Sequence, residues 1–487
     1  MKQDRKTLRM VMVTTAAALY LTVSAHAKGG AAVSQHEIHV AGKTIDYVAE
    51  AGTVAIRDDK SGEAHGHMFF TAYRVPTSGT RPVMFLWNGG PGANSAALHF
   101  EAFGPKRISG AALSDNDATL LTTTDLVFVD PIGTGFSRSA KSAYDSAFYS
   151  TLGDFIATET FIRTWLAERH AENAPIYLVG ESFGVWRAAG VAEALERDHR
   201  PVAGIVLISG GAGVGNDRIP RPLSIALRTP NRAATALFYG KLPVDIGTEV
   251  GPVVDAATAW AKTRYAPALA QLDALTDAQR DAIAHELARF TGLKPDQIDR
   301  HTLAVSPRAY LGALLKDQGK TLNTFDMRRT SEPAGDVQTI LSYFHHDLGY
   351  NTTLAYAGLD ATAGASSDPT APAPGAINRN WNYNSGPITP EVMAAAQAGE
   401  GPPGSQPWAL NAIALDPKLR ILVAAGLYDS LNSCAANDVL RAALDPAFAG
   451  NFTMKCYSGG HMMYRDDLAR AQLSADVKAF VSGAAEH

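Results

Sequence analysis

The strongest chemical signal in the chain is a serine within the pattern G-E-S-F-G at residues 180–184. The apolar run 176–179 leads directly into this pattern, and a helical stretch follows from Val185. A tight turn between a strand and a helix exposes the oxygen of such a serine and is typical of a nucleophile. The alternative is an ordinary turn flanked by glycines. The strand before it and the helix after it favour Ser182 as a nucleophile.

A serine nucleophile requires a base that takes its proton and an acidic group that orients the base. Asp429 follows the apolar run 421–425, and His461 follows the expected strand 451–456 in a Gly-Gly-His loop. Both stand just past the end of an expected strand, where the sites of α/β proteins collect. Serine, acid and histidine also occur in the chain order that accompanies this kind of elbow. We therefore expect Ser182, Asp429 and His461 to form a catalytic triad.

A glycine-rich turn, N-G-G-P-G at residues 88–92, follows the apolar run 83–87. Backbone N–H groups of such a turn can stabilise a developing oxyanion, together with the N–H of Phe183, the residue after the nucleophile. Phosphate binding is the rival interpretation, but no Gly-Lys-Ser/Thr follows the turn. The histidine pairs at 65/67 and 345/346 lack further ligands at metal-site spacing. No metal or organic cofactor is expected.

The elements that position these residues are indicated by uninterrupted apolar runs, which suit strands buried on both faces of a parallel sheet. The runs cover residues 83–87, 126–129, 176–179, 205–208 and 421–425. Helical patterns lie between several of them, which indicates an α/β fold. Before them, residues 36–76 alternate apolar and polar side chains, which predicts antiparallel strands. From residue 213 to 406 helical patterns replace the strand runs.

These patterns predict one α/β domain that is split by an insertion. Residues 28–212 are its first part, 213–406 a helical cap insertion and 407–487 its second part. Residues 1–27 resemble a signal peptide, because a basic stretch precedes a short apolar segment and the Ala25-His26-Ala27 cleavage signal. An uncleaved anchor is the alternative, but the apolar segment is short for a membrane span. We expect a secreted or periplasmic protein without stable membrane association after cleavage.

The charge and the cysteine content of the chain indicate which kinds of partner and which cellular compartment to expect. The net charge is −5, and no run of like charges reaches five residues, which argues against a nucleic-acid binder. The chain has two cysteines, Cys434 and Cys456, and export would allow a disulfide between them. Two buried free thiols are the alternative.

Four blocks of the chain together resemble the serine carboxypeptidase family. They are W-N-G-G-P-G at 87–92, F-V-D-P-I-G-T-G-F-S at 128–137, G-E-S-F-G at 180–184 and G-G-H-M at 459–462. They occur in the order found in the family. The residues around His461, and the tyrosine before Asp429, resemble the bacterial branch most.

The resemblance implies an α/β-hydrolase fold with a helical cap, a mostly parallel central sheet and antiparallel N-terminal strands. It implies Ser182 as nucleophile, His461 as base and Asp429 as its partner. Gly90 and Phe183 would supply the oxyanion N–H groups. Asn88 and Glu181 match the residues that bind the C-terminal carboxylate of a peptide substrate.

The chain departs from the family pattern at two positions. Ala93 replaces a frequent cysteine, so the disulfide made there is absent. Ala102 stands where many members have a glutamate that supports the carboxylate site, and Glu101 is adjacent. We expect a serine-type carboxypeptidase that acts on peptides through an acyl-enzyme. The alternatives are an esterase or acyltransferase on the same scaffold, and a binding module without catalysis.

Overall fold

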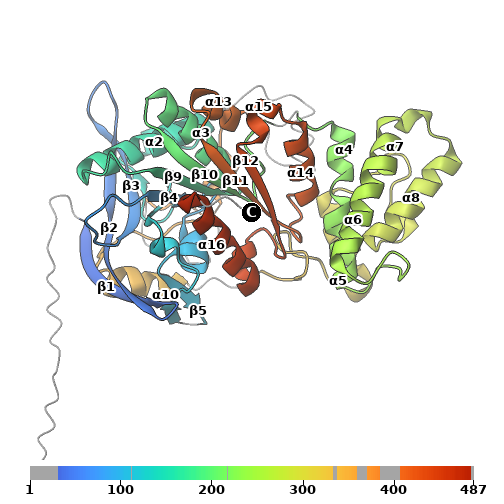
Figure 1. Cartoon of the computed structure of the whole chain (residues 1–487), viewed down its shortest axis with the longest axis horizontal. Helices are drawn as coiled ribbons and strands as arrows, with labels where there is room; N and C mark the ends of the chain where they lie inside the picture. Colours follow the sequence, from blue (N-terminus) through green and yellow to red (C-terminus); the bar gives the residue numbers. More distant parts are fainter. Residues whose placement is uncertain are drawn as a thin grey trace, which may run out of the picture.

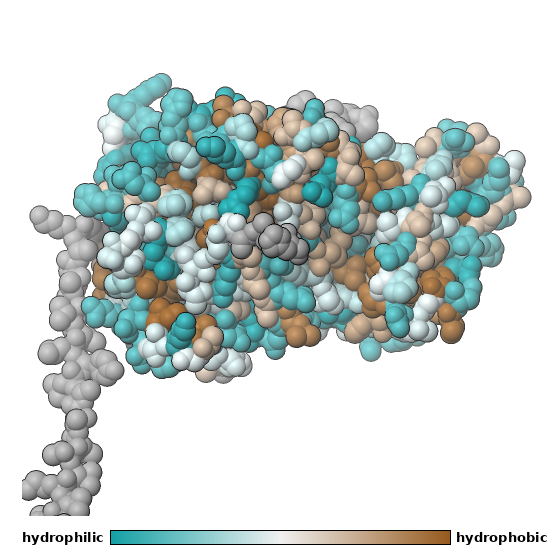
Figure 2. Space-filling view, viewed as in Figure 1, coloured by the Kyte–Doolittle hydropathy of each residue, from teal (hydrophilic) through white to brown (hydrophobic). Residues whose placement is uncertain are grey.

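The computed structural model describes residues 31–110, 112–215, 218–332, 337–358, 370–373, 375–383 and 406–483. The expected signal peptide, residues 1–27, lies outside these ranges. Within them, no helix has both the length and the apolar composition needed to cross a bilayer. The face of the molecule seen in Figure 2 is largely hydrophilic, with apolar residues in scattered groups.

A mixed ten-stranded sheet forms the centre of the fold (Figure 1). Its three outer strands are antiparallel, and they are β1 (Ala32–Val40), β2 (Lys43–Arg57) and β3 (Ala64–Arg74). The order then continues through β7 (Asp125–Val129), β4 (Val83–Trp87), β9 (Ile176–Glu181), β10 (Val202–Ile208), β11 (Arg420–Gly426) and β12 (Phe452–Tyr457), which are parallel to one another. The short strand β8 (Arg138–Ser139) pairs with β3, and β5 (Lys106–Ser109) forms a separate hairpin with β6 (Ala112–Asp115). The predicted α/β class, with antiparallel strands first, is confirmed.

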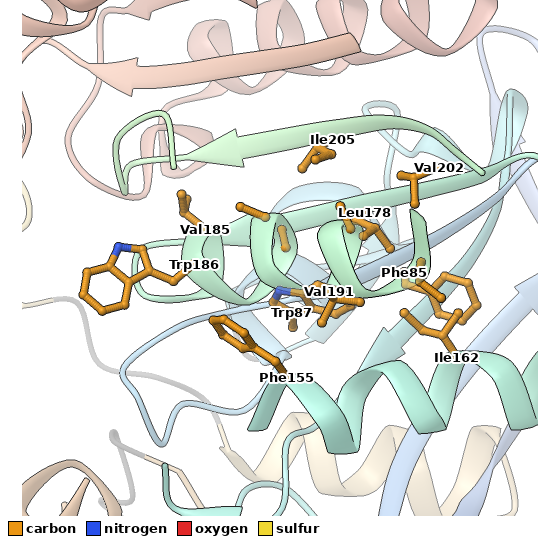
Figure 3. Packing of buried hydrophobic residues seen from close by; sticks show 14 of the residues in the cluster. Phe85, Trp87, Phe155, Ile162, Leu178, Val185, Trp186, Val191, Val202 and Ile205 are labelled. Carbon is orange, nitrogen blue, oxygen red and sulfur yellow. The ribbon is translucent and has the colours of Figure 1, made fainter. Parts of the chain in front are cut away.

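The parallel strands are apolar throughout because both faces of the sheet are covered. In β4, Phe85 and Trp87 belong to the core on one face, while Met84 and Leu86 belong to the core on the other. The first core contains residues of α2 (Thr151–Glu168), α3 (Gly184–Arg197) and α13 (Trp408–Leu415). Figure 3 shows Phe155 and Ile162 of α2 directed toward this core beside α3. The second core contains residues of α16 (Asp467–Ser482) and of the π-helical turn η1 (Leu98–Phe103).

A helical unit with its own core lies at one end of the molecule (Figure 1). Its helices are α4 (Arg221–Ala226), α5 (Thr229–Phe238), α6 (Val250–Trp260), α7 (Ala266–Ala270), α8 (Asp277–Thr291) and α9 (Pro307–Ala313). Helix α8 begins at the capping box that Thr276 and Gln279 form, and it ends at Gly292 in the left-handed conformation.

The expected insertion 213–406 is not a single helical unit. Tyr343 and Phe344, in the π-helical turn η8 (Tyr343–Asp347) after α10 (Val337–Ser342), join the second core against the sheet. Ile377 and Trp381 join the first core. The apolar runs typical of buried strands stop after residue 213, which predicted helices. This pattern does not predict which core those helices pack against. Among the described residues of this range, those from α4 to Met327 form a core of their own.

Cys434 and Cys456 form a disulfide, with a Cα–Cα distance of 5.6 Å. It ties the first residue of α14 (Cys434–Ala443) to β12. The two cysteines are 22 residues apart, and closing a loop of this size contributes about 3 kcal/mol in the chain-entropy account. The loops that carry Asp429 and His461 flank this cross-linked stretch.

Candidate active site

The ends of five adjacent parallel strands, β4, β9, β10, β11 and β12, lie level with one another. In register, Trp87 pairs with Gly180 and Ile208 pairs with Glu181. On the other side of β10, Ile208 pairs with Ala424, and Gly426 pairs with Tyr457 beyond it. The loops that carry the expected nucleophile, acid and base therefore leave the sheet at one edge.

Ser182 lies on a sharp turn between β9 and α3. Its φ angle is 56°, in the left-handed region that non-glycine residues seldom adopt. Gly180 and Gly184 are required beside it. A Cβ atom on Gly180 would collide with the carbonyl of Gly184, and one on Gly184 would lie 2.9 Å from the Trp87 ring. The glycines of the sequence pattern thus allow the strand, the turn and the helix to approach one another closely.

The imidazole of His461 donates a hydrogen bond through Nδ1 to Oδ2 of Asp429, over 2.8 Å. The Asp429 carboxylate also accepts hydrogen bonds from the backbone N–H of Leu431 at 2.8 Å and from the Asn432 side chain at 2.9 Å. Burial alone would lower the pKa of His461, but the charge and the hydrogen bond of Asp429 outweigh it, so the pKa is raised. This arrangement suits a base whose protonated form is stabilised.

The other ring nitrogen of His461, Nε2, is buried and has no hydrogen-bond partner among the described residues. The structure thus joins Asp429 to His461 and places Ser182 at the same edge of the sheet, without a hydrogen bond between Ser182 and His461. Such bonds are often long before substrate binds. The backbone of His461 is held in place by the Ser209 hydroxyl, which donates to its carbonyl over 2.6 Å.

The glycine-rich turn after β4 lies directly against the serine turn. A Cβ atom on Gly89 would lie 2.5 Å from the backbone nitrogen of Phe183. Within the described chain, neither the N–H of Gly90 nor that of Phe183 donates to a protein acceptor. Both groups are therefore available to a developing oxyanion, as expected for such a site.

A buried ion pair supports this turn, and sequence reasoning missed it. Arg187 of α3 donates to the carbonyl of Asn88 over 2.9 Å and pairs with Asp154 of α2 over 2.7 Å. The Arg187 side chain is only 1% exposed. The available signal was a single charged residue within the apolar stretch V-W-R-A-A-G-V-A of α3. Burying an unpaired arginine destabilises the folded state, so its position indicates a structural role.

Asn88 and Glu181 are buried together beside the serine. Asn88 accepts a hydrogen bond from the backbone N–H of Leu98 over 3.1 Å, and its side chain also hydrogen-bonds to Glu181. The Tyr464 hydroxyl donates to Oε2 of the Glu181 carboxyl. Burial raises the pKa of Glu181, although the nearby positive charges and these hydrogen bonds oppose the rise. Tyr464 was not singled out in the sequence.

Glu101, the neighbour of the substituted position Ala102, is paired with Arg465. Its carboxylate accepts hydrogen bonds from Arg465 at 2.5 and 3.2 Å. In the part of the chain that the structure describes, no three metal-ligating side chains are grouped so as to hold an ion. Of the histidine pairs considered as ligands, His65 stacks on Tyr144 and His345 bonds to the Tyr350 carbonyl.

The family model and the curated relatives that match this chain are all described as carboxypeptidases or carboxypeptidase-like. Residues 43–205 match the family model described as serine carboxypeptidase. A pheromone-processing carboxypeptidase KEX1 from Blastomyces gilchristii is 32% identical over 125 residues, which cover 25% of this chain and 19% of the relative. Serine carboxypeptidase-like 45 from Arabidopsis thaliana is 28% identical over 145 residues, 28% of this chain and 30% of the relative. The matched regions thus span less than a third of these curated relatives.

Among solved structures, the prohormone-processing carboxypeptidase KEX1(delta)P from Saccharomyces cerevisiae superimposes with a TM-score of 0.53. The identity is 15%, and the alignment covers 90% of this chain and 91% of the other, so the likeness concerns the fold. The relatives named here are fungal and plant proteins. The expected closeness to the bacterial branch is therefore not supported.

Proposed function

Because residues 43–205 match the serine carboxypeptidase family model, we propose that this chain hydrolyses C-terminal residues from peptides through an acyl-enzyme on Ser182. One observation carries the substrate class. A buried carboxyl group, Glu181, directly precedes the nucleophile and bonds to Asn88. Two carboxyl groups in contact share a proton when one of them is neutral, which lets Glu181 recognise the carboxylate of a peptide C-terminus.

In this proposal, His461 takes the proton from the Ser182 hydroxyl through Nε2 as the oxygen attacks the peptide carbonyl. Asp429 holds the imidazole by Nδ1 and stabilises the imidazolium that forms. The N–H groups of Gly90 and Phe183 stabilise the oxyanion of the tetrahedral intermediate. His461 then gives its proton to the leaving amine, and water releases the acyl group by the same steps.

The free carboxylate of the substrate provides the test. A blocked dipeptide with a free C-terminus is expected to react at least about 10-fold faster, in kcat/KM, than the same dipeptide as its amide, since binding to Glu181 and Asn88 is lost in the amide. Asn88→Ala should erase this preference. The same dipeptide is also offered as its ester. Turnover of the ester that exceeds turnover of the free acid, in both the wild type and Asn88→Ala, would instead favour an esterase or acyltransferase.

The raised pKa of Glu181 gives the reaction a pH dependence. Below its pKa, Glu181 is neutral and binds the substrate carboxylate. Above it, two negative charges repel each other. The KM for the free acid is therefore expected to be lowest at acidic pH and to rise as the pH rises through the pKa of Glu181. Glu181→Gln, which stays neutral, should flatten this rise in KM. A wild-type kcat/KM that stays constant from about pH 4 to pH 8 would contradict the assignment.

We also propose that the protein is exported, to the periplasm or beyond the cell. The signal-like pattern in residues 1–27 and the disulfide between Cys434 and Cys456 support this proposal, because disulfides persist in oxidising compartments. Mass spectrometry of the exported protein would find Lys28 at the N-terminus. Recovery of the full-length chain from the cytoplasm alone would contradict export.

A further inference from the structure

Arg232 of α5 is a buried cation that has no carboxylate partner in the described part of the chain. The residue is 4% exposed, and its guanidinium donates one hydrogen bond to the described residues, from Nη2 to the Val305 carbonyl over 2.7 Å. Its Cζ atom lies 5.0 Å from the centre of the Tyr310 ring, whose face favours a cation. Arg187, which is also buried, pairs instead with Asp154. A buried charge destabilises the fold unless an opposite charge accompanies it, so Arg232 requires a counter-charge.

The charged and titratable groups around Arg232 do not supply this counter-charge. The groups that act on its guanidinium are Arg228, which is a second cation, and the hydroxyls of Tyr265 and Tyr310. Both hydroxyls donate to backbone carbonyls and stay protonated, because burial raises their pKa. Burial and the charge of Arg228 lower the pKa of Arg232 to about 10, which still leaves the guanidinium charged at neutral pH.

A small cavity lies beside Arg232, between the helical unit and the loop of the triad acid. Arg228 and Arg232 line it from the helical unit, and Asp429, Ser430 and Asn432 line it from the loop. Its volume is about 10 Å³, close to the space that one water molecule or one small ion requires, and too small for a phosphate or a carboxylate side chain. Arg228, Ser430 and Asn432 are half-buried, so an ion can enter from solvent.

The helix that carries Arg232 also holds the loop of the triad acid. The side-chain amide of Asn231 donates to the backbone carbonyls of Asp429 and Asn432, over 3.1 and 2.9 Å. The Asp429 carboxylate is hydrogen-bonded to His461 and forms no hydrogen bond with Arg232 in the described structure. An occupant of the cavity that binds Arg232 therefore stabilises the packing of α5 against this loop.

We propose that this cavity binds one monovalent anion of the size of chloride on the Arg232 guanidinium. The ion accepts hydrogen bonds from the guanidinium N–H groups that have no acceptor among the described residues, and its charge compensates the buried cation. Water is the rival occupant, since it can donate to the buried Oδ1 atom of Asn231, which has no partner in the described chain. Water leaves the cation uncompensated, which favours the anion. The site does not depend on the reaction proposed at Ser182.

The first test uses no substrate. Wild type, Arg232→Met, Arg232→Lys and the control Arg264→Met, which removes an exposed arginine between α6 and α7, are dialysed into methanesulfonate. Each protein is unfolded in urea with and without chloride at equal ionic strength. Chloride at about 100 times its Kd is expected to lower the unfolding constant of wild type and of Arg264→Met about 100-fold. Arg232→Met should lose this dependence, and Arg232→Lys should retain it with a higher Kd.

Crystals grown in bromide test the position of the ion. An anomalous peak within hydrogen-bond distance of the Arg232 guanidinium is expected in wild type and not in Arg232→Met. A wild type without this peak would overturn the site, and so would chloride stabilisation of equal size in wild type and Arg232→Met. If Arg232→Met does not fold, the bromide peak and the chloride dependence of the wild type decide the matter.

The ion is also expected to affect catalysis, a consequence that rests on the proposed reaction at Ser182. Removal of chloride should lower the kcat of the wild type and leave KM unchanged, because Asn231 holds the loop of Asp429 and not the substrate. The kcat of Arg264→Met should respond to chloride in the same way, and that of Arg232→Met should not respond. A wild type that binds bromide at Arg232 but hydrolyses no peptide in either salt would uphold the anion site and refute the proposed peptidase function.

Discussion

Ser182→Ala is expected to lower kcat/KM about 10⁶-fold toward any substrate that the wild type hydrolyses, because no acyl-enzyme can form without the hydroxyl. The oxyanion N–H groups and the binding residues remain in this variant. Residual turnover should therefore still exceed the reaction in water, by about 10³-fold. Product release measured by mass spectrometry, in single-turnover and steady-state experiments, gives both quantities.

The matched control for this loss is Ser114→Ala, an exposed serine of β6 far from residue 182 in the sequence. It should leave kcat/KM unchanged. An acylating inhibitor should add its mass to the wild type at Ser182 and leave the variant unmodified. Turnover that survives Ser182→Ala would refute the nucleophile assignment. A wild type that binds peptides without any turnover would instead favour a binding module.

Asp429→Asn is expected to lower kcat about 10⁴-fold with little change in shape. The carboxylate accepts the Nδ1 proton of His461. The amide nitrogen of asparagine can donate instead, which turns the imidazole to the tautomer with its proton on Nε2. In that form His461 cannot take the proton from Ser182. The positive charge on the imidazolium in the transition state also loses its partner.

The pH profile of Asp429→Asn separates this role from a structural one. The charge of Asp429 raises the pKa of His461, so its removal lowers that pKa and moves the acidic limb of kcat/KM to lower pH. Asp273→Asn, at an exposed position of the helical unit, should change neither kcat nor the profile. Equal thermal midpoints for the two variants show that Asp429→Asn is folded. A folded Asp429→Asn with wild-type kcat would contradict the triad.

The sequence indicated the sheet and the order of the site residues because the signals are local. Apolar runs such as 83–87 are buried on both faces, and the glycines around Ser182 are required by close backbone contacts. The supporting contacts could not be predicted, since they join distant segments. The bond from Tyr464 to Glu181 and the packing of Phe325 on His461 depend on which loops meet at the strand ends. Hydrophobic periodicity does not predict which distant loops come into contact.

The pairing of β10 with β11 has a consequence for how the chain assembles during synthesis. Ile208 and Ala424 are neighbours in the sheet, but roughly two hundred residues separate them along the chain. At about 5–20 residues per second, the ribosome needs on the order of 10 to 40 seconds to make that stretch. During this interval β10 is an open edge with unpaired N–H and C=O groups, which can pair with other chains. The helical unit has its own core and can fold within the same interval, so it can mature before the sheet closes.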